Sequence, residues 1–173
     1  MVSLNYNKDD IINALTAAGL QQGDTAYFST SLGMIGIAEG VKNHKDLNLL
    51  FFEAIKLVLG PEGTALIPTY SYTFGETDKF NPPIYDPLTT PAKVGPFPNF
   101  FLKQKGVIRS LDPMMSVAGL GPSAEVLFKD LPQTSYGKDC LFARLVNFPN
   151  TKCISIGLGP NWVPFIHYAD WLA

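Results

Sequence analysis

The sequence holds only two histidines and two cysteines in 173 residues. Neither Cys140 nor Cys153 belongs to a Cys-x-x-Cys motif or a His/Cys cluster, so we expect no zinc site and no other bound metal. Both cysteines lie in apolar stretches, "KDCLFARL" and "TKCISIGL". We therefore expect two buried, reduced thiols, with a disulfide as the open alternative.

Charged residues are also scarce, at 16%, and the net charge is -2 with no basic run. These values exclude the electrostatic footprint of a nucleic-acid-binding protein. No uncharged apolar run approaches the ~20 residues needed to span a bilayer. The N-terminus "MVSLNYNKDD" lacks the apolar core of a signal peptide. We therefore expect a soluble, cytoplasmic protein without a membrane span.

Apolar periodicity predicts helices and strands that alternate along the chain. The stretches "NKDDIINALTAAGL" and "KDLNLLFFEAIKLVLG" each read as an amphipathic helix that a glycine ends. Strands are expected in "GDTAYFSTSLG", "EGTALIPTYSYTF", "SVAGLG" and "KCISIGLG", and shorter helices in "PNFFLKQKG", "PSAEVLFKDL" and "DCLFARLVN". This order predicts an α/β fold, with a mixed sheet and helices on both faces, in a single three-layer domain over residues 1–173.

The segment from Asn81 to Pro98 is rich in proline. It could be a linker between domains, but the aromatic residues Tyr85 and Phe97 within it favour an ordered excursion across the surface. The phenylalanine-rich stretches "LLFFEAI" and "PNFFLK" are candidates for covering an interface between subunits. A homo-oligomer is therefore one expected arrangement.

The predicted strands also suggest where a ligand binds. In open α/β sheets, ligands lie where loops leave the carboxyl ends of the strands. Three such loops are "STSLG", "PTYSYTF" and "GLGPNW", which are rich in small, hydroxyl and aromatic residues. Their backbone N–H groups can approach a ligand closely. The "GLG" does not complete a dinucleotide-binding fingerprint.

The chain's last residues include "IHYAD", which places His167 and Asp170 three residues apart. On a helix, such residues share one face, and a carboxylate there can hold an imidazole in one tautomer. The alternative is a histidine in an aromatic cluster with a surface aspartate. The other histidine, His44 in "KNHKD", is expected to be a solvated residue where a helix begins.

Five segments, in order over residues 20–170, resemble the aminoglycoside 3-N-acetyltransferase family, an acetyl-CoA-dependent group that includes antibiotic-resistance enzymes and does not have the GNAT fold. They are "GDTAYFSTSLGMIG", "GPEGTALIPTYSYTF", "YDPLTTPAKVGPFPNFF", "GVIRSLDPMMSVAGLG" and "IHYAD". The last resembles the family's His-x-x-Glu segment. It is the resemblance that implies acetyl-CoA as the acetyl donor.

The resemblance implies a general base and an orienting carboxylate. His167 takes the place of the family's base, and Asp170 takes the place of its acidic partner. An amine that attacks a thioester must lose a proton, and a neutral imidazole is suited to accept it near neutral pH. The resemblance also implies a set of cofactor-binding residues: Ser31, Leu32, Thr69, Tyr70, Ser71, Val107, Arg109 and Ser110.

Purely structural roles are the alternatives for several of these residues. Arg109 offers a planar fork of donors to a phosphate, or it forms a salt bridge to Asp112 or Asp86. Ser31 and Thr69 contribute either to cofactor binding or to turn chemistry alone. A hydrolase with Ser31 as nucleophile is disfavoured because "STSLG" lacks the Gly-x-Ser-x-Gly pattern.

The chain departs from the family pattern at four places. Asp112 stands where the family has histidine, Pro164 where it has threonine, and Asp170 where it has glutamate. The fourth departure is the stop at Ala173, because the family continues beyond His-x-x-Glu. Three explanations stay open: the chain is one domain of a longer protein, a partner completes the cleft, or this is a shortened relative.

The leading hypothesis is therefore an N-acetyltransferase that moves an acetyl group from acetyl-CoA to an amine. Aminoglycosides are polycations, and the few carboxylates do not predict a strongly acidic cleft. An amino sugar with fewer charges is thus as consistent an acceptor as an aminoglycoside. The alternative is a non-catalytic module that binds acyl-CoA or a sugar.

Overall fold

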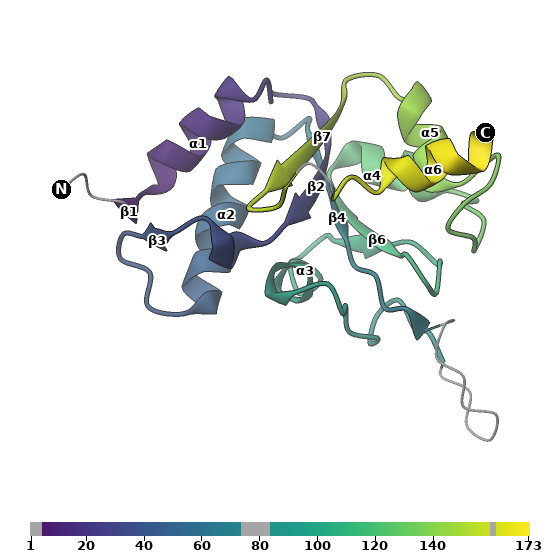
Figure 1. Ribbon diagram of the computed structural model, residues 1–173, viewed down its shortest axis with the longest axis horizontal. Coiled ribbons are helices and arrows are strands. Elements are labelled where there is room, and N and C mark those ends of the chain that lie inside the picture. Colours follow the sequence, from purple (N-terminus) through teal and green to yellow (C-terminus); the bar gives the residue numbers. More distant parts are fainter. Residues whose placement is uncertain (1–4, 74–83, 160–161) are drawn as a thin grey trace.

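The computed structural model describes residues 5–73, 84–159 and 162–173. Its elements are shown in Figure 1 and are, in chain order, β1 (Asn5–Tyr6), α1 (Lys8–Ala17), β2 (Thr25–Thr30), the short 3₁₀ helix η1 (Leu32–Met34), β3 (Ile37–Ala38), α2 (His44–Leu59), β4 (Thr64–Pro68), α3 (Pro96–Phe101), β5 (Ile108–Arg109), β6 (Val117–Leu120), α4 (Pro122–Phe128), α5 (Leu141–Asn147), β7 (Thr151–Ile156) and α6 (Phe165–Leu172).

The two long helices begin at asparagine caps. The Asn7 side chain accepts hydrogen bonds from the backbone N–H groups of Asp9 and Asp10, and the Asp10 carboxylate accepts one from the Asn7 N–H, which makes a capping box. The Asn43 side chain caps α2 by accepting hydrogen bonds from the N–H groups of Lys45 and Asp46. That helix ends at Gly60, whose φ of 67° suits glycine. Both helices predicted from periodicity are confirmed.

The main sheet has five strands in the order β5-β6-β4-β2-β7. Strand β2 lies between β4 and β7 and is parallel to both, whereas β6 is antiparallel to β4 and to β5. A separate parallel pair joins β1 to β3. The sheet is therefore mixed, as predicted.

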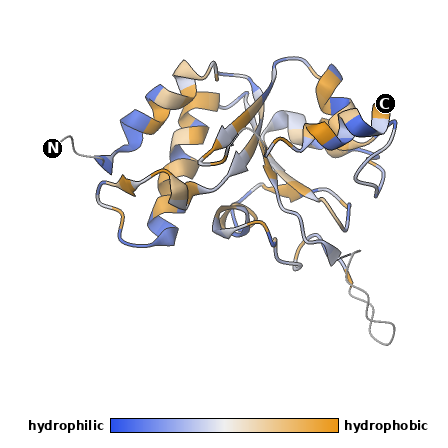
Figure 2. Cartoon of the chain, viewed as in Figure 1, coloured by the Kyte–Doolittle hydropathy of each residue, from blue (hydrophilic) through white to orange (hydrophobic). Residues whose placement is uncertain are grey.

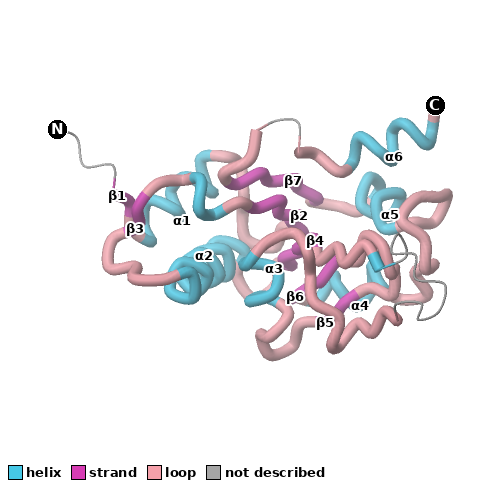
Figure 3. The backbone as a smooth tube through the Cα atoms, turned by 60° about the horizontal axis from the view of Figure 1, so that its bottom comes forward, coloured by secondary structure: helices cyan, strands magenta, loops and turns pink. Residues whose placement is uncertain are grey.

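Side chains alternate between two apolar cores along the central strands. On β2, Ala26 and Phe28 enter the core that α1, α2 and α3 cover, whereas Tyr27 enters the core that α4 and α5 cover. On β4, Leu66 shares the second core with Tyr27. Figure 3 shows the strands running between these two groups of helices. This alternation produces the three layers, and the predicted fold class is confirmed.

The last helix lies at the edge of this arrangement. It contacts α5, and the chain's C-terminus lies beside α5 in Figures 1 and 3. None of its side chains is buried, although Figure 2 shows strongly hydrophobic residues on it. Trp171 and Leu172 are both exposed. Helix α6 is thus attached to the fold on one side and open to solvent on another.

The phenylalanine-rich stretches pack against each other inside the chain. The Phe52 ring contacts the rings of Phe100 and Phe101 at centroid distances of 6.0 Å, and Phe51 is also buried. Most of the apolar surface that suggested a subunit interface is thus used in the protein's own core. A homo-oligomer stays a prediction.

The proline-rich segment is ordered where the structure describes it, from residue 84 onward. The Asn99 side chain donates to the carbonyl oxygens of Ala92 and Gly95 and accepts from the Ala92 N–H. The Tyr85 hydroxyl donates to the Ser110 carbonyl oxygen at 2.7 Å. Residues 81–83 lie outside the described residues. The ordered excursion is therefore confirmed for 84–98.

The cysteine prediction is half wrong. Both thiols are free, and Cys140 is buried, but Cys153 is exposed. The reason is that Cys153 lies on β7, an edge strand with only β2 as a neighbour. Among the described residues, no helix is long and apolar enough to cross a membrane.

Candidate active site

Three strands bring their carboxyl ends to one edge of the sheet, because β2, β4 and β7 are parallel. Ser31 follows β2, Thr69 follows β4, and Gly157 follows β7. The Ser31 N–H donates to the Ile156 carbonyl oxygen at 2.8 Å. Gly157 has φ 69°, and a Cβ there would collide with the Ser31 carbonyl oxygen. The first and third predicted ligand loops are therefore in direct contact.

A cavity of about 230 Å³ opens beside Ser31. Its walls come from residues 30–33, from the first turns of α2 and from residues 94–98. Ser31 and Leu32, both predicted to bind the cofactor, line it, and so do His44 and the buried Asn48. The Asn48 amide makes no side-chain hydrogen bond within the described residues. The Asn48 amide gives this cavity a donor for a ligand, whereas the first N–H groups of α2 are already bound by the Asn43 cap.

His44 is the first residue of α2 and is exposed, as predicted for a residue where a helix begins.

The hydroxyl groups that follow β4 are buried and used within the protein. Thr69 Oγ1 donates to the Ser116 carbonyl oxygen at 3.1 Å, and Ser116 Oγ donates to the Thr69 carbonyl oxygen at 2.8 Å. Ser71 Oγ donates to the Pro113 carbonyl oxygen. These bonds tie the loop after β4 to the segment before β6. The predicted cofactor roles of Thr69 and Ser71 stay predictions.

Tyr70 lies in the core behind this loop. Its hydroxyl and that of Tyr27 are 2.7 Å apart, and both rings are buried. Burial raises the pKa of Tyr27 well above its usual value and also raises the pKa of Tyr70, so both stay protonated. The Tyr27 ring packs edge-on against Phe165, the first residue of α6. The tyrosine pair therefore connects β2 and β4 to the helix that carries His167.

Arg109 is the centre of a hydrogen-bond network. Its Nε donates to Thr69 Oγ1 and to Ser116 Oγ, each at 3.1 Å. Its Nη2 donates to the Thr69 carbonyl oxygen at 2.6 Å, and its Nη1 donates to the Thr90 carbonyl oxygen. The guanidinium lies over the Tyr85 ring, 5.1 Å from the centroid. Burial lowers the pKa of this guanidinium.

The network bears on both sequence-based interpretations of Arg109. The salt bridge to Asp112 or Asp86 is wrong, because Lys8 and Glu53 form the only salt bridge among the described residues. All three guanidinium nitrogens contact protein oxygens, so Arg109 clamps segment 85–90 onto the sheet. A phosphate contact stays a prediction.

The two neighbours predicted with Arg109 flank β5: Ser110 follows the strand, and Val107 precedes it at the other end. Ser110 is buried, and its Oγ accepts a hydrogen bond from the Val117 N–H at 2.9 Å. Val107 is partly buried and packs against the core under α2 and α3. Asp112, where the family has histidine, is buried and accepts a hydrogen bond from the Met114 N–H.

His167 and Asp170 are both exposed on α6. The His167 ring contacts the Tyr136 ring at a centroid distance of 5.8 Å. No hydrogen bond joins His167 to Asp170, although the two lie three residues apart on the helix. Neither residue lines the 230 Å³ cavity. Their predicted roles as base and orienting carboxylate stay predictions.

Sequence reasoning missed two residues near this edge. Ser29, on β2, is buried, and its Oγ has no hydrogen-bond partner. Tyr136 lies 31 positions before His167, in a segment without periodicity, and its hydroxyl donates to Met115 Sδ. An unpaired buried hydroxyl marks a place where a ligand atom can bind. The serine-rich "FSTSLG" was the available signal for Ser29. Among the described residues, no His, Cys, Asp and Glu side chains group to hold a metal ion.

The fold and this edge define an α/β protein with a candidate ligand site at the carboxyl ends of three parallel strands. The family profile described as aminoglycoside 3-N-acetyltransferase matches residues 30–173. The chain belongs to this family, which confirms the resemblance.

Individual relatives and solved structures support this family membership. The chain is 29% identical to aminoglycoside N(3)-acetyltransferase VII of Streptomyces paromomycinus over 92% of its own length and 58% of the relative's. The structure resembles sisomicin-bound AAC-VIa with a TM-score of 0.84 and 25% identity, covering 98% of this chain and 66% of that one. It shares its fold with AAC-IIIb in a binary complex with CoASH, at a TM-score of 0.82 and 24% identity, with the same coverage. The chain thus spans less than two thirds of these proteins.

Proposed function

We propose that this chain carries out acyl transfer from acetyl-CoA to an amine of an aminoglycoside or amino sugar, with His167 as the general base. Family membership supports the reaction class, and the sisomicin-bound relative supports an aminoglycoside acceptor. The observation that carries the proposal is the position of His167. It is exposed on a helix that follows β7, whose carboxyl end meets the loop of Ser31.

The cavity beside Ser31 suits part of the cofactor. The unpaired Asn48 amide offers a donor to a polar group of the cofactor, and Leu32 forms an apolar wall. The loop amides near Ser31 and the orphaned Ser29 hydroxyl suit the amides of a pantetheine arm. These groups fit coenzyme A. Acetyl-CoA supplies the thioester whose acetyl group is transferred.

The residues of the chain then have defined tasks. The acceptor amine forms the new C–N bond with the acetyl carbon while the thioester C–S bond breaks. The amine must lose one proton, which His167 accepts, and coenzyme A leaves as the thiolate that takes up a proton to become the free thiol. Asp170 lies on the same helix and favours the imidazolium through space, without a hydrogen bond to His167. Arg109 fixes segment 85–90 against the sheet, and Tyr27 packs against Phe165 of the helix that carries His167. The cytoplasmic location stays a prediction.

A thiol-release assay tests the activity. The purified chain is incubated with acetyl-CoA and a panel of aminoglycosides and amino sugars, and free coenzyme A is measured by thiol colorimetry. We expect release above the acceptor-free rate for at least one amine, with the acetylated product seen by mass spectrometry. The absence of release with every amine would contradict the proposal.

The second candidate is a module that binds acyl-CoA or a sugar without catalysis. It is favoured by the missing hydrogen bond between His167 and Asp170 and by the share of the relatives that the chain spans. Calorimetry separates the two candidates. Binding of coenzyme A without thiol release in the presence of any amine supports the module.

A further inference from the structure

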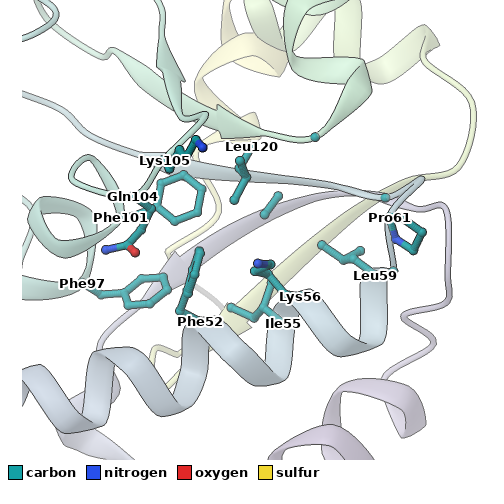
Figure 4. A pocket seen from close by; sticks show the side chains of 14 residues that line it. Phe52, Ile55, Lys56, Leu59, Pro61, Phe97, Phe101, Gln104, Lys105 and Leu120 are labelled. Atoms are coloured by element: carbon teal, nitrogen blue, oxygen red, sulfur yellow. The ribbon is translucent and has the colours of Figure 1, made fainter.

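A second cavity, of about 350 Å³, lies toward the other end of the sheet. Strand β4 begins at Thr64, and the cavity touches Gly63 and Ala65, whereas Thr69 of the candidate active site follows the strand's other end. Figure 4 shows the cavity between α2 and the sheet. Its volume lies within the ~300–1,000 Å³ range of small-molecule sites.

The walls of this cavity are apolar. Figure 4 shows the rings of Phe52, Phe97 and Phe101 gathered on one side. Ile55 and Leu59 of α2 and Leu120 of β6 complete the lining. A surface of rings and branched aliphatic side chains favours a hydrocarbon over a sugar, because it offers no side-chain hydroxyl to pair with one.

The charged residues that line the cavity are all positive. They are Lys56 and Lys105, and no aspartate or glutamate lines it. Glu53, one turn before Lys56 on α2, binds Lys8 of α1 at 2.5 Å instead. The Lys56 ammonium therefore has no carboxylate partner in the described part of the chain and lies 5.3 Å from the centroid of the Phe52 ring.

Lys105 reaches the cavity from the segment after α3, so the two ammonium groups belong to different elements. It, too, forms no ion pair within the described ranges. Gln104 beside it donates its Nε2 to the Phe100 carbonyl oxygen at 2.8 Å, which leaves the two lysines as the free charged donors in the lining. An apolar pocket lined by unpaired cations is complementary to a molecule with an apolar body and one anionic end.

We propose that this cavity binds an unbranched aliphatic carboxylate, with its hydrocarbon chain among Phe52, Phe97 and Phe101 and its carboxylate between Lys56 and Lys105. The site is separate from the candidate active site, and the proposal does not depend on acetyl transfer. Phe97 also lines the 230 Å³ cavity, so α3 is the wall between the two sites.

Calorimetry with decanoate tests this site, at concentrations below those at which decanoate aggregates. We expect saturable binding of one molecule per chain, with a negative heat-capacity change from the burial of apolar surface. Decanol, which has the same chain and no charge, should bind at least about fivefold more weakly, and decylammonium more weakly still. Added salt should weaken the binding of decanoate and leave the binding of decanol unchanged.

Two lysine variants and two matched controls locate the carboxylate. Lys56→Met and Lys105→Met keep much of the length of each side chain and remove its charge. Together they should weaken the affinity for decanoate at least about fivefold. The controls are Lys45→Met, on α2, and Lys103→Met, just after α3. These two lysines do not line the cavity, so the variants should leave the affinity for decanoate unchanged. Thermal unfolding of each variant shows whether it is folded.

Three results would overturn the inference. They are no saturable binding of decanoate, equal binding of decanoate and decanol, and unchanged decanoate affinity in a folded Lys56→Met/Lys105→Met variant. Amide NMR shifts give an independent location: decanoate should move the Gly63 and Gly121 signals, which belong to residues that line the cavity. Shifts confined to residues around Ser31 would place the ligand in the other cavity and refute the assignment.

Discussion

The imidazole of His167 packs against the phenol ring of Tyr136, with 5.8 Å between centroids and 59° between planes. Tyr136 is in turn stacked on Phe142, which is buried. The contact holds one side of an otherwise exposed imidazole against the core under α5. Tyr136 rather than Asp170 is therefore the side chain that contacts and positions the His167 ring in this structure.

This relationship predicts that the Tyr136 ring matters more than its hydroxyl. Tyr136→Ala should lower kcat about tenfold or more, because the imidazole loses its fixed orientation. Tyr136→Phe keeps the ring and should stay within about twofold of the parent. The kcat and KM of both variants are compared, together with the NMR signals of the His167 ring. Equal loss of kcat in the two variants would assign the role to the hydroxyl instead.

Ser29→Ala is predicted to affect turnover but not stability. The Ser29 hydroxyl is buried and unpaired, so Ser29→Ala removes no protein hydrogen bond and should change the free energy of unfolding by less than about 1 kcal/mol. If the hydroxyl pairs with bound cofactor or acceptor, turnover should fall about tenfold, the equivalent of one hydrogen bond. Urea unfolding and thiol release measure the two effects. Unchanged turnover would remove Ser29 from the site.

Arg109 is predicted to act on stability. Arg109→Met leaves the Thr90 carbonyl oxygen without its donor and removes one of the two donors to the Thr69 carbonyl oxygen, which keeps Ser116 Oγ, so it should cost about 2–3 kcal/mol of unfolding free energy. Arg109→Lys should recover little, because an ammonium cannot reproduce the planar fork. Urea unfolding measures both, with Lys103→Met as an exposed control. A loss of coenzyme A affinity at unchanged stability would instead support the phosphate contact.

Gly157 is predicted to be irreplaceable where the Ser31 loop meets the end of β7. A Cβ there would collide with the Ser31 carbonyl oxygen, and φ is 69°, so Gly157→Ala should destabilise the fold by about 2 kcal/mol or more. Gly159→Ala is the matched control, since a Cβ there meets nothing within 4 Å. Thermal unfolding compares the two. Similar melting temperatures would show that the loops are less tightly joined than the structure indicates.

Local patterns predicted most of the fold. The helical periodicity and the glycine stops placed α1 and α2, because a helix is specified by residues near one another in sequence. The Asn43 cap of α2 was not predicted. The two-residue strands β1, β3 and β5 carried no such pattern and were not expected. Helix α3 begins at Pro96 and ends at Phe101, whereas the predicted stretch began later and ran to Gly106.

The site was less predictable because its contacts join distant residues. The "PTYS" and "STSLG" loops could be placed at one sheet edge from topology alone. The partners of Arg109 lie 19 and 40 positions away, and the Tyr136 ring lies 31 positions from His167. Sequence spacing carries no information on such pairs. It therefore supplied a salt bridge for Arg109 where the structure has backbone oxygens, and it gave no sign of the Tyr136 ring beside His167.

The central claim concerns one imidazole, and His167→Gln tests it most directly. The glutamine keeps hydrogen-bonding capacity but cannot accept the amine proton at neutral pH, so turnover should fall at least about 100-fold. The dissociation constant of coenzyme A, measured by calorimetry, should stay within about twofold, and an exposed α4 variant, Glu125→Gln, should keep both values. Full turnover in a folded His167→Gln protein would contradict the account.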